Sequence, residues 1–564
     1  MRRQADANPP FTEGEAAQVT EWMAKQVRSG KTVPVSDEEA RDLIGLFTSP
    51  VVGAPKPGAP EGTIRTCHHL SSGGELSVNE GIDFDPLSPI GLLLVDSVVS
   101  CMRYMRRMEP TRKIRIAKLD MEGFFRQIPL RRRDMARVTQ RWNGVMNVHT
   151  AFTFGARSAP HVCSVVTNAL CDEMARLGHF CQCFVDDCVI VAFEEDIQRA
   201  VDELRRLVKA FGLIENVDKY VASTNEVAVV GVLFNTDTMT VSITAEKKAS
   251  TLLLLRRAVS CKDISVGDLR VLGGKLNFLA AVVPFGRSFC SFVWRLAGGA
   301  HVPAHKRRAV TRNLHWAVQW WIEVLEGKRF TVANMLLGTP EAPLFIVSAV
   351  SSDACDRGFG GVSRTHRKFM RGLWWTSEVV DAAQINVREC FGALIMVAAL
   401  AHARFLNGVI LVFEVDNECT MWGVNKGHSK KHVLNFLVHA FNVIQERYRF
   451  VIVMKHLAGV LNVNSDGLSR GVEPLTLGLS TANGWSEILI PTVVRQLLSI
   501  ALENMQHEHV LGFCQNPRTR LFVTLEDFVA SGTRTPTATE RAVPIPWVAF
   551  RDTLALTTTE SAAV

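Results

Sequence analysis

The run HFCQCFVDDCVIVAF (179–193) is largely apolar, yet two adjacent aspartates stand near its centre. Two like charges in an apolar segment cost free energy, because burial and mutual repulsion both disfavour ionised carboxylates. Asp is a common turn residue, so one explanation is an exposed turn between two strands. The other is a bound cation. Asp186 and Asp187 alone do not decide between these explanations.

The length of the chain, 564 residues, exceeds what one hydrophobic core serves, so several domains are expected. Hydrophobic residues make up 47% and charged residues 21%, which excludes global disorder. The net charge of +7 is compatible with nucleic-acid binding but does not require it. A Pro/Gly-rich stretch at 49–63 separates a short N-terminal helical region from the first compact body.

The chain contains no segment that we expect to cross a membrane. Its longest apolar stretch, CFGALIMVAALAHA (390–403), is broken by His402 and Arg404 before it reaches the ~20 residues that a bilayer requires. The N-terminal residues lack the apolar core of a signal peptide. We therefore expect no membrane partner.

The 13 cysteines are odd in number and irregularly spaced, which predicts reduced thiols in an intracellular compartment, cytoplasmic or nuclear. Five of them gather near His179, but their spacing matches no familiar zinc pattern. We favour ordinary packing of small buried side chains for this group. Its members are Cys163, Cys171, Cys181, Cys183 and Cys188.

Apolar periodicity divides the chain into three parts. Helical patterns alternate with strands from about 90 to 250, as in RIAKLDM (115–121) and EDIQRAVDELRRLVKAFGL (195–213). Residues 250–335 are predicted to be mostly helical. A strand-rich unit opens at PLFIVSAVSSDAC (343–355) and continues to about 470, after which the pattern loosens.

Asp120 stands at the end of the apolar strand predicted in the first part. A carboxylate there is well placed to bind a metal, although an Asp before MEGFF is equally suited to cap a helix. If Asp120 converges with Asp186 and Asp187, three carboxylates would hold two Mg²⁺ ions. Such a pair of ions, ~3.5–4 Å apart, stabilises both the attacking and the leaving oxygen in phosphoryl transfer, the chemistry of polymerases and nucleases.

The segments LDMEGFFRQIPL (119–130), FTFGARSAP (152–160) and FVDD (184–187) resemble, in this order, the palm motifs of reverse transcriptases. The resemblance extends over about residues 45–300. Further matching segments are similar to the fingers, the next palm motif, the primer grip and the thumb, at residues 49–82, 213–223, 229–244 and 269–287.

This resemblance implies that Asp120 and Asp186 bind the metal ions and that Asp187 supports the site. It also implies that Lys219 donates a proton to the leaving pyrophosphate, although an exposed lysine at a helix end is the simpler alternative. FVDD has phenylalanine where the family usually has tyrosine, which removes a hydroxyl and retains the ring.

The residues implied to contact the incoming dNTP lie in three segments. Lys56 and Arg65 would grip the triphosphate, and Arg157 would lie near phosphate. Phe125 falls at the aromatic position that blocks a ribose 2′-hydroxyl, so dNTPs would be selected over rNTPs. Ordinary core packing is the alternative for Phe125.

A second group of acids lies in the strand-rich unit. Asp353 and Asp416 end predicted strands, Glu389 falls in the first turn of an apolar helix, and Asp466 follows His456 by ten residues. Four carboxylates at such positions again suit two metal ions. Each carboxylate alone is compatible with a helix cap or a surface charge.

The order of these residues resembles the active site of ribonuclease H, and HLAGVLNVNSDGLSR (456–470) is similar to the signature of retrotransposon RNase H domains. The resemblance implies that the four carboxylates bind metal. It places His456 on a mobile loop, where it aids product release or proton transfer; capping of a strand end is the alternative. Asn417 would contact the RNA strand.

Together the resemblances imply an α+β and α/β multidomain protein, in which a right-hand polymerase precedes an RNase H-like mixed sheet with helices. The expected parts are an N-terminal helical region, fingers and palm, a thumb or connection, an RNase H-like domain, and a partly disordered C-terminal extension. They occupy residues 1–48, 49–250, 251–335, 336–475 and 476–564.

The implied activity is RNA-directed DNA polymerisation together with RNase H cleavage, with two Mg²⁺ ions in each active site and Mn²⁺ as an alternative. The partners would be an RNA template, a DNA primer, the RNA–DNA hybrid and dNTPs. The residue pattern HHLS…SVN resembles that of proteins from retrotransposons of the tyrosine-recombinase type, DIRS-like or VIPER-like. The recombinase, integrase and gag-like functions of such an element would lie on other chains. The alternatives are a domesticated, catalytically weak copy that binds nucleic acid, and a chain in which only the nuclease is active.

Overall fold

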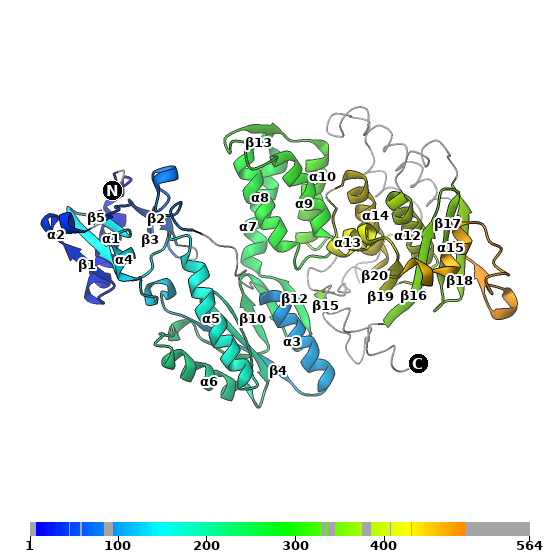
Figure 1. Cartoon of the computed structure of the whole chain (residues 1–564), viewed down its shortest axis with the longest axis horizontal. Helices are drawn as coiled ribbons and strands as arrows, with labels where there is room; N and C mark the ends of the chain where they lie inside the picture. The colour runs from blue at the N-terminus through cyan, green and yellow to red at the C-terminus, as the bar shows by residue number, and fades with distance from the viewer. Residues whose placement is uncertain are drawn as a thin grey trace. The chain divides into compact units, whose positions relative to one another are not determined.

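The computed structural model divides into two compact units, Met1–Val230 and Gly231–Val564 (Figure 1). It describes residues 7–43, 45–56, 59–83, 94–329, 334–335, 345–374, 385–406, 408–429 and 431–490. The expected disorder at the C-terminal end falls mainly on 491–564, outside the described residues.

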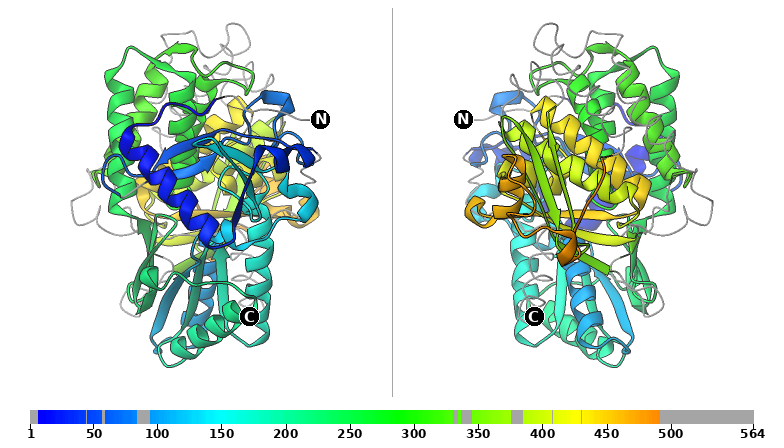
Figure 2. Two further views of the ribbon diagram at one scale, coloured as in Figure 1. Left: turned by 90° about the vertical axis from the view of Figure 1, so that its left-hand side faces the viewer. Right: turned by 90° about the vertical axis from the view of Figure 1, so that its right-hand side faces the viewer.

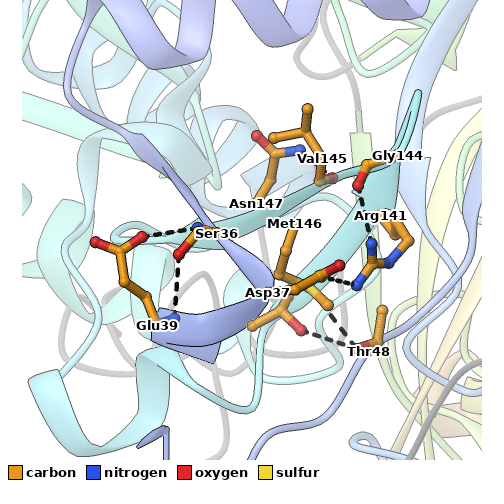
Figure 3. Close-up of polar contacts among 10 residues, drawn as sticks. Ser36, Asp37, Glu39, Thr48, Arg141, Gly144, Val145, Met146 and Asn147 are labelled. Atoms are coloured by element: carbon orange, nitrogen blue, oxygen red, sulfur yellow. Dashed lines mark hydrogen bonds and ion pairs between the residues drawn. The ribbon is translucent and has the colours of Figure 1, made fainter. Parts of the chain in front are cut away.

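The N-terminal part of the first unit is a small sheet with two capped helices. Strand β6 (Val145–His149) pairs antiparallel with both β1 (Thr32–Val35) and β5 (Thr139–Trp142). Helix α2 (Asp37–Asp42) begins at a capping box in which Ser36 and Glu39 bond each other's backbone amides (Figure 3). Arg141 on β5 pairs with Asp37 in the same view and thereby connects α2 to the sheet.

The central sheet of the first unit has the strand order β7-β8-β4-β9, with every neighbouring pair antiparallel. Its strands are β4 (Ile114–Asp120), β7 (Phe180–Phe184), β8 (Asp187–Phe193) and β9 (Val221–Thr224). Helices α5 (Ala159–Arg176) and α6 (Ile197–Ala210) contact each other and pack against this sheet (Figure 1). The apolar side chains of α6 recur every three or four residues, which buries one stripe of the helix.

The first unit contains further helices and strands. They are α1 (Glu13–Arg28), β2 (Val51–Pro55), β3 (Ile64–His68), η1 (Gly74–Leu76), α3 (Leu94–Met108), η2 (Phe124–Gln127), α4 (Arg132–Met135), η3 (Val217–Lys219) and β10 (Glu226–Val229).

One disulfide corrects the prediction that all the cysteines are reduced. Cys183 on β7 and Cys188 on β8 lie directly opposite each other in the hairpin and are bonded. This bond could not be predicted, because the spacing of two cysteines does not reveal that they face each other across a pair of strands.

The second unit opens with a helical body. Its strands are β11 (Val232–Asn235), β12 (Thr240–Ile243), β13 (Asp263–Ser265), β14 (Arg307–Ala309) and β15 (Asn334–Met335), and its helices are α7 (Ala245–Ser260), α8 (Val266–Leu279), α9 (Gly286–Ala297) and α10 (Arg312–Leu325). Phe289 of α9 stacks on Trp320 of α10 with ring centroids 3.8 Å apart, and both are buried. The predicted helical character of 250–335 is therefore confirmed for the described residues.

A six-stranded mixed sheet follows, with the order β20-β19-β16-β17-β18-β21. Strands β16, β17 and β18 form an antiparallel meander, whereas β19 and β20 add in parallel on the other side of β16. The strands are β16 (Phe345–Ala354), β17 (Gly358–Ser363), β18 (Lys368–Leu373), β19 (Val409–Val415), β20 (Val451–His456) and β21 (Ser486–Glu487). The helical elements after β18 are α12 (Ile385–His402), α13 (Glu418–Lys426), α14 (His432–Tyr448), η4 (Gly459–Leu461), α15 (Val463–Ser469) and η5 (Thr481–Asn483).

Two glycines on β17 let helices approach both faces of this sheet. A Cβ on Gly360 would lie 2.5 Å from the Cβ of Leu468 on α15, and one on Gly361 would lie 3.2 Å from the sulfur of Met396 on α12. Because successive residues of a strand face opposite sides, α15 and α12 cover opposite faces. The right-hand view of Figure 2 shows helices of this unit alongside its strands.

Helix α12 is long and apolar enough to cross a membrane by length and composition alone. It packs on β16, β17 and α14, and 78% of its length is buried inside the protein. This burial accounts for its apolar composition as that of a core helix.

Candidate active sites

The first acidic site lies where strands β4 and β8 meet the β7–β8 turn. Asp120 is the last residue of β4 and pairs in register with Asp187, the first residue of β8. Asp186 lies in the two-residue turn between β7 and β8. The alternative that Asp120 caps a helix is wrong, because no helix begins there and its carbonyl oxygen accepts the Asn216 amide instead.

The turn that carries Asp186 is strained. Val185 has φ of 58°, in the left-handed region that β-branched residues avoid. The Met121 amide donates to the carbonyl oxygen of Asp186 at 3.1 Å, which ties the turn to the end of β4. The strain therefore lies in the segment that holds the acid, as is common at functional sites.

Lysines neutralise two of the three carboxylates. The Lys219 ammonium bonds both oxygens of Asp120, at 3.0 and 3.1 Å, and Lys118 pairs with Asp187 at 2.9 Å. Burial, with smaller contributions from the charges of Asp187 and Asp120, raises the pKa of Asp186. The predicted site residues Asp120, Asp186, Asp187 and Lys219 are thus brought together, and this all-oxygen set of ligands suits Mg²⁺.

The residues predicted to contact dNTP are more widely spread. Phe125 is half-buried against Phe154, with ring centroids 5.1 Å apart. Lys56 and Arg65 are exposed on and beside the β2–β3 hairpin. No hydrogen bond or ion pair joins them to Asp120 within the part of the chain that the structure describes.

Asn79 organises the loop that contains Arg157, a role that no sequence pattern indicates. Its side chain donates to the carbonyl oxygen of Gly155 and accepts the Arg157 amide, each at 2.9 Å. Gly155 has φ of +113°, and a Cβ there would lie 2.0 Å from the carbonyl oxygen of His68. Only glycine fits this position, so Asn79 and Gly155 together set the path of the loop.

The second acidic site lies on the mixed sheet of the second unit. Carboxylate oxygens of Asp353, Glu389 and Asp416 lie within 4.8 Å of one another. Asp353 is the penultimate residue of β16, Asp416 directly follows β19, and Glu389 is the fifth residue of α12 rather than part of its first turn. Because β16 and β19 are parallel neighbours, their carboxyl ends bring Asp353 and Asp416 to the same edge.

Burial dominates the electrostatics of this second site. It raises the pKa of Asp353 to about 6, with help from the charges of Asp416 and Asp466, and it raises the pKa of Glu389 to about 7, with help from Asp416. The pKa of Asp416 is also raised by burial. Among the residues that the structure describes, none of these three carboxylates has a lysine or arginine partner. Three clustered carboxylates that repel one another suit a divalent cation, and their oxygens are the ligands that Mg²⁺ prefers.

Asp466 and His456 lie at the border of this group. Asp466, on α15, pairs with Arg470 at 2.8 Å, and its charge contributes to the raised pKa values of Asp353 and Asp416. His456 is the exposed last residue of β20, opposite Val415, and its charge opposes the rise in the pKa of Asp416.

Two positioning contacts were not predicted. Ser469 donates to Asp353 at 2.8 Å, which explains how α15 orients the strand-borne acid. Asn417, expected to contact RNA, caps α13 through the Thr420 amide and donates to Glu389. The sequence shows such polar residues but not which acid each one meets.

Residues 92–234 match the family model described as reverse transcriptase (RNA-dependent DNA polymerase). No curated protein matches the chain. Among solved structures, the foamy viral protease-reverse transcriptase dRH in complex with double-stranded DNA is similar, with 12% identity, a TM-score of 0.48, and coverage of 80% of this chain and 71% of that one. The foamy viral protease-reverse transcriptase in complex with double-stranded DNA shows 13% identity, a TM-score of 0.47, and coverage of 81% and 85%.

Identities and TM-scores this low leave the assignment to the family match. That match contains Asp120, Asp186 and Asp187, the three acids of the first site. Residues 92–234 are therefore a reverse transcriptase domain.

Proposed function

We propose that the chain is an RNA-directed DNA polymerase with RNase H activity, encoded by a retrotransposable element of the DIRS-like or VIPER-like type. One observation carries the proposal: each of two separate groups of carboxylates gathers beside the ends of strands, and the first group lies within the reverse transcriptase domain. The protein would act inside the cell, in the cytoplasm or the nucleus, on an RNA template, a DNA primer and dNTPs. Recombinase, integrase and gag-like functions would lie on other chains.

In the first site, Asp120 and Asp186 would hold Mg²⁺, and the ion would supply electrostatic stabilisation of the charge that develops during phosphoryl transfer. Asp187 supports Asp186 through the hairpin that both occupy. Lys219 lies 3.0 Å from Asp120 and donates a proton to pyrophosphate. Phe125 supports the sugar, and Arg157, Lys56 and Arg65 bind the phosphates.

In the second site, Asp353, Glu389, Asp416 and Asp466 would hold divalent ions, which would supply the charge stabilisation needed to hydrolyse an RNA phosphodiester. The close spacing of the first three supports this role. So does the strand order of the sheet, which places two of them at adjacent carboxyl ends. His456, at the exposed end of β20, moves protons or assists product release.

The test measures both activities on one preparation. A labelled DNA primer is extended on an RNA template with Mg²⁺ and dNTPs, while cleavage of the RNA is followed in parallel. We expect Asp186→Asn to abolish extension but retain cleavage, and Asp466→Asn to do the reverse. A matched control is Asp202→Asn, which removes an acid from α6 outside both sites.

The proposal fails in separable parts. Absence of extension by the wild-type protein, under conditions in which it is folded, would remove the polymerase assignment. RNA cleavage that persists in both Asp466→Asn and Asp353→Asn would remove the nuclease assignment. Tight hybrid binding without either activity would instead indicate a domesticated nucleic-acid-binding protein.

A further inference from the structure

Four cysteines gather beneath the turn that carries Asp186. The sulfurs of Cys171, Cys181 and Cys183 lie within 4.8 Å of one another, and the Cys171 and Cys183 sulfurs are 3.5 Å apart. The fourth, Cys188, is bonded to Cys183. None of these sulfurs has a role in the proposed polymerase chemistry.

The secondary structure explains why the sulfurs meet. Cys181 and Cys183 are two residues apart on β7, so they face the same side of the sheet. Cys188 lies opposite Cys183 on β8, and α5, which carries Cys171, packs against β7. Residues from three elements thus converge on one point, although their spacing along the chain matches no familiar zinc pattern.

Plain packing of buried cysteines accounts less well for this arrangement. A buried cysteine normally behaves as a small apolar side chain, and nothing then requires several sulfurs to face one another. Cys163, on the same helix and in the same core, lies outside the group.

The distances suit a tetrahedral zinc site. Zinc is held by thiolates at ~2.3 Å, which places the sulfurs of a tetrahedron about 3.8 Å apart. The Cys171–Cys183 separation of 3.5 Å is close to that value. Soft sulfur ligands also select Zn²⁺ over the Mg²⁺ that the neighbouring carboxylates prefer.

We propose that Cys171, Cys181, Cys183 and Cys188 form a tetrathiolate Zn²⁺ site in the reduced protein, directly beneath the catalytic turn. A dithiol reductant supplies two electrons and two protons to the Cys183–Cys188 bond, which breaks into two thiols while the reductant becomes a disulfide. Binding of Zn²⁺ then releases the four thiol protons to solvent. The disulfide is the oxidised, zinc-free form of the same site.

The site would fix the catalytic hairpin to α5. Cys183 and Cys188 are the residues that flank Phe184–Asp187, so a metal bound to both would close the base of the turn. Cys171 would connect that base to the helix. Zinc is therefore expected to stabilise the reverse transcriptase domain whether or not the domain polymerises DNA.

The test begins with full-length protein reduced without oxygen and incubated with Zn²⁺ in excess Mg²⁺. After removal of free metal, bound zinc is measured by elemental analysis. Co²⁺ is then substituted, because its thiolate charge-transfer absorption distinguishes sulfur ligands from the carboxylates. Thermal unfolding with and without Zn²⁺ is measured on Cys171→Ser, Cys181→Ser and the control Cys163→Ser.

We expect roughly one zinc ion per reduced wild-type chain, a thiolate band with Co²⁺, and a higher unfolding temperature with Zn²⁺. Cys163→Ser should retain all three properties, whereas Cys171→Ser and Cys181→Ser should lose them while folding without zinc. No zinc in the reduced wild type would overturn the proposal, as would equal zinc in Cys171→Ser or a Co²⁺ spectrum without thiolate absorption. Because every readout is binding or unfolding, a failed polymerase assay leaves the outcome unaffected.

Discussion

The two acidic sites of this protein differ in how the repulsion among their clustered carboxylates is reduced. In the first, Lys219 and Lys118 neutralise Asp120 and Asp187. In the second, no lysine or arginine among the described residues pairs with Asp353, Glu389 or Asp416, and burial raises all three pKa values. The reverse transcriptase site therefore carries its own counter-charges, whereas the other site depends on protons or an added cation.

This difference predicts how each site responds to metal. A lysine that pairs with a metal-binding carboxylate loses that ion pair when a cation binds. This loss reduces the stability that the protein gains from the metal. Carboxylates that repel one another gain more, because the cation removes their repulsion as well as forming bonds. Mg²⁺ should thus stabilise the second unit more than the first.

The largest effect is expected from Lys219. If it donates a proton to pyrophosphate, Lys219→Met should slow primer extension by on the order of 100-fold, with Lys219→Arg less affected. Single-turnover extension by the wild type and both variants measures this loss.

RNA cleavage by the same variant is the control and should remain at the wild-type rate. A loss of extension below about threefold would show that Lys219 only balances the charge of Asp120. The two sites would then differ only in how the charges of their carboxylates are balanced.

The sequence predicted which acids of the first site lie at strand ends, but not which side chains contact them. Asp120 and the Asp186–Asp187 pair were placed at strand ends because apolar periodicity locates strands, and the structure agrees. Their lysine partners could not be predicted from the sequence. Lys118 lies beside an acid of β8 because of the register in which β4 and β8 pair, and the sequence does not show that register. Periodicity predicts elements, but register decides which side chains meet.

The same limit applies to the second site and to the cysteines. Strand ends at Asp353 and Asp416 were predicted correctly, yet the Ser469 contact required the packing of α15 on Gly360. Strand β21 is too short to show any periodicity, and it still extends the sheet through β18. The sulfur cluster was dismissed on spacing, which does not report on three-dimensional proximity.

A second prediction concerns pH and the second site. The folded pKa of Asp353, about 6, lies above its ordinary value of 3.8, so protonation stabilises the fold at low pH and that stability is lost as pH rises toward 6. In metal-free protein, Asp353→Asn should therefore raise the free energy of unfolding at pH 8 by on the order of 2 kcal/mol, since solvent screens part of the shift. At pH 5 the difference should be roughly half as large, because the folded acid is mostly protonated while the unfolded acid, with its ordinary pKa of 3.8, is already ionised.

Urea unfolding at both pH values, in the presence of a chelator, measures this change. The matched variant Asp187→Asn breaks the pair with Lys118 and should not stabilise the protein at pH 8. Saturating Mg²⁺ should reverse the order for Asp353→Asn, since only the wild type gains binding energy. An Asp353→Asn protein less stable than wild type at pH 8 without metal would contradict the proposed repulsion.

The smallest predicted effect separates the two sites by backbone strain. Val185, with φ of 58°, lies in the turn that carries Asp186, whereas the acids of the second site lie on strand ends and helices. An alanine at position 185 keeps that strain, because its Cβ still clashes in the left-handed region, and a glycine relieves it. We therefore expect Val185→Gly to be more stable than Val185→Ala by about 1 kcal/mol, since both variants lose the same valine packing.

The control for this pair is Ala192→Gly in the interior of β8, where glycine should instead cost roughly 0.5–1 kcal/mol. Chemical unfolding of the three variants gives the difference directly. If Val185→Gly is the less stable of the pair, the turn is not strained, and the hairpin holds Asp186 through pairing alone. If Val185→Gly is more stable than Val185→Ala but extends primers more slowly, the strained backbone holds the Asp186 carboxylate in its active orientation. The first site would then depend on backbone strain, and the second would not.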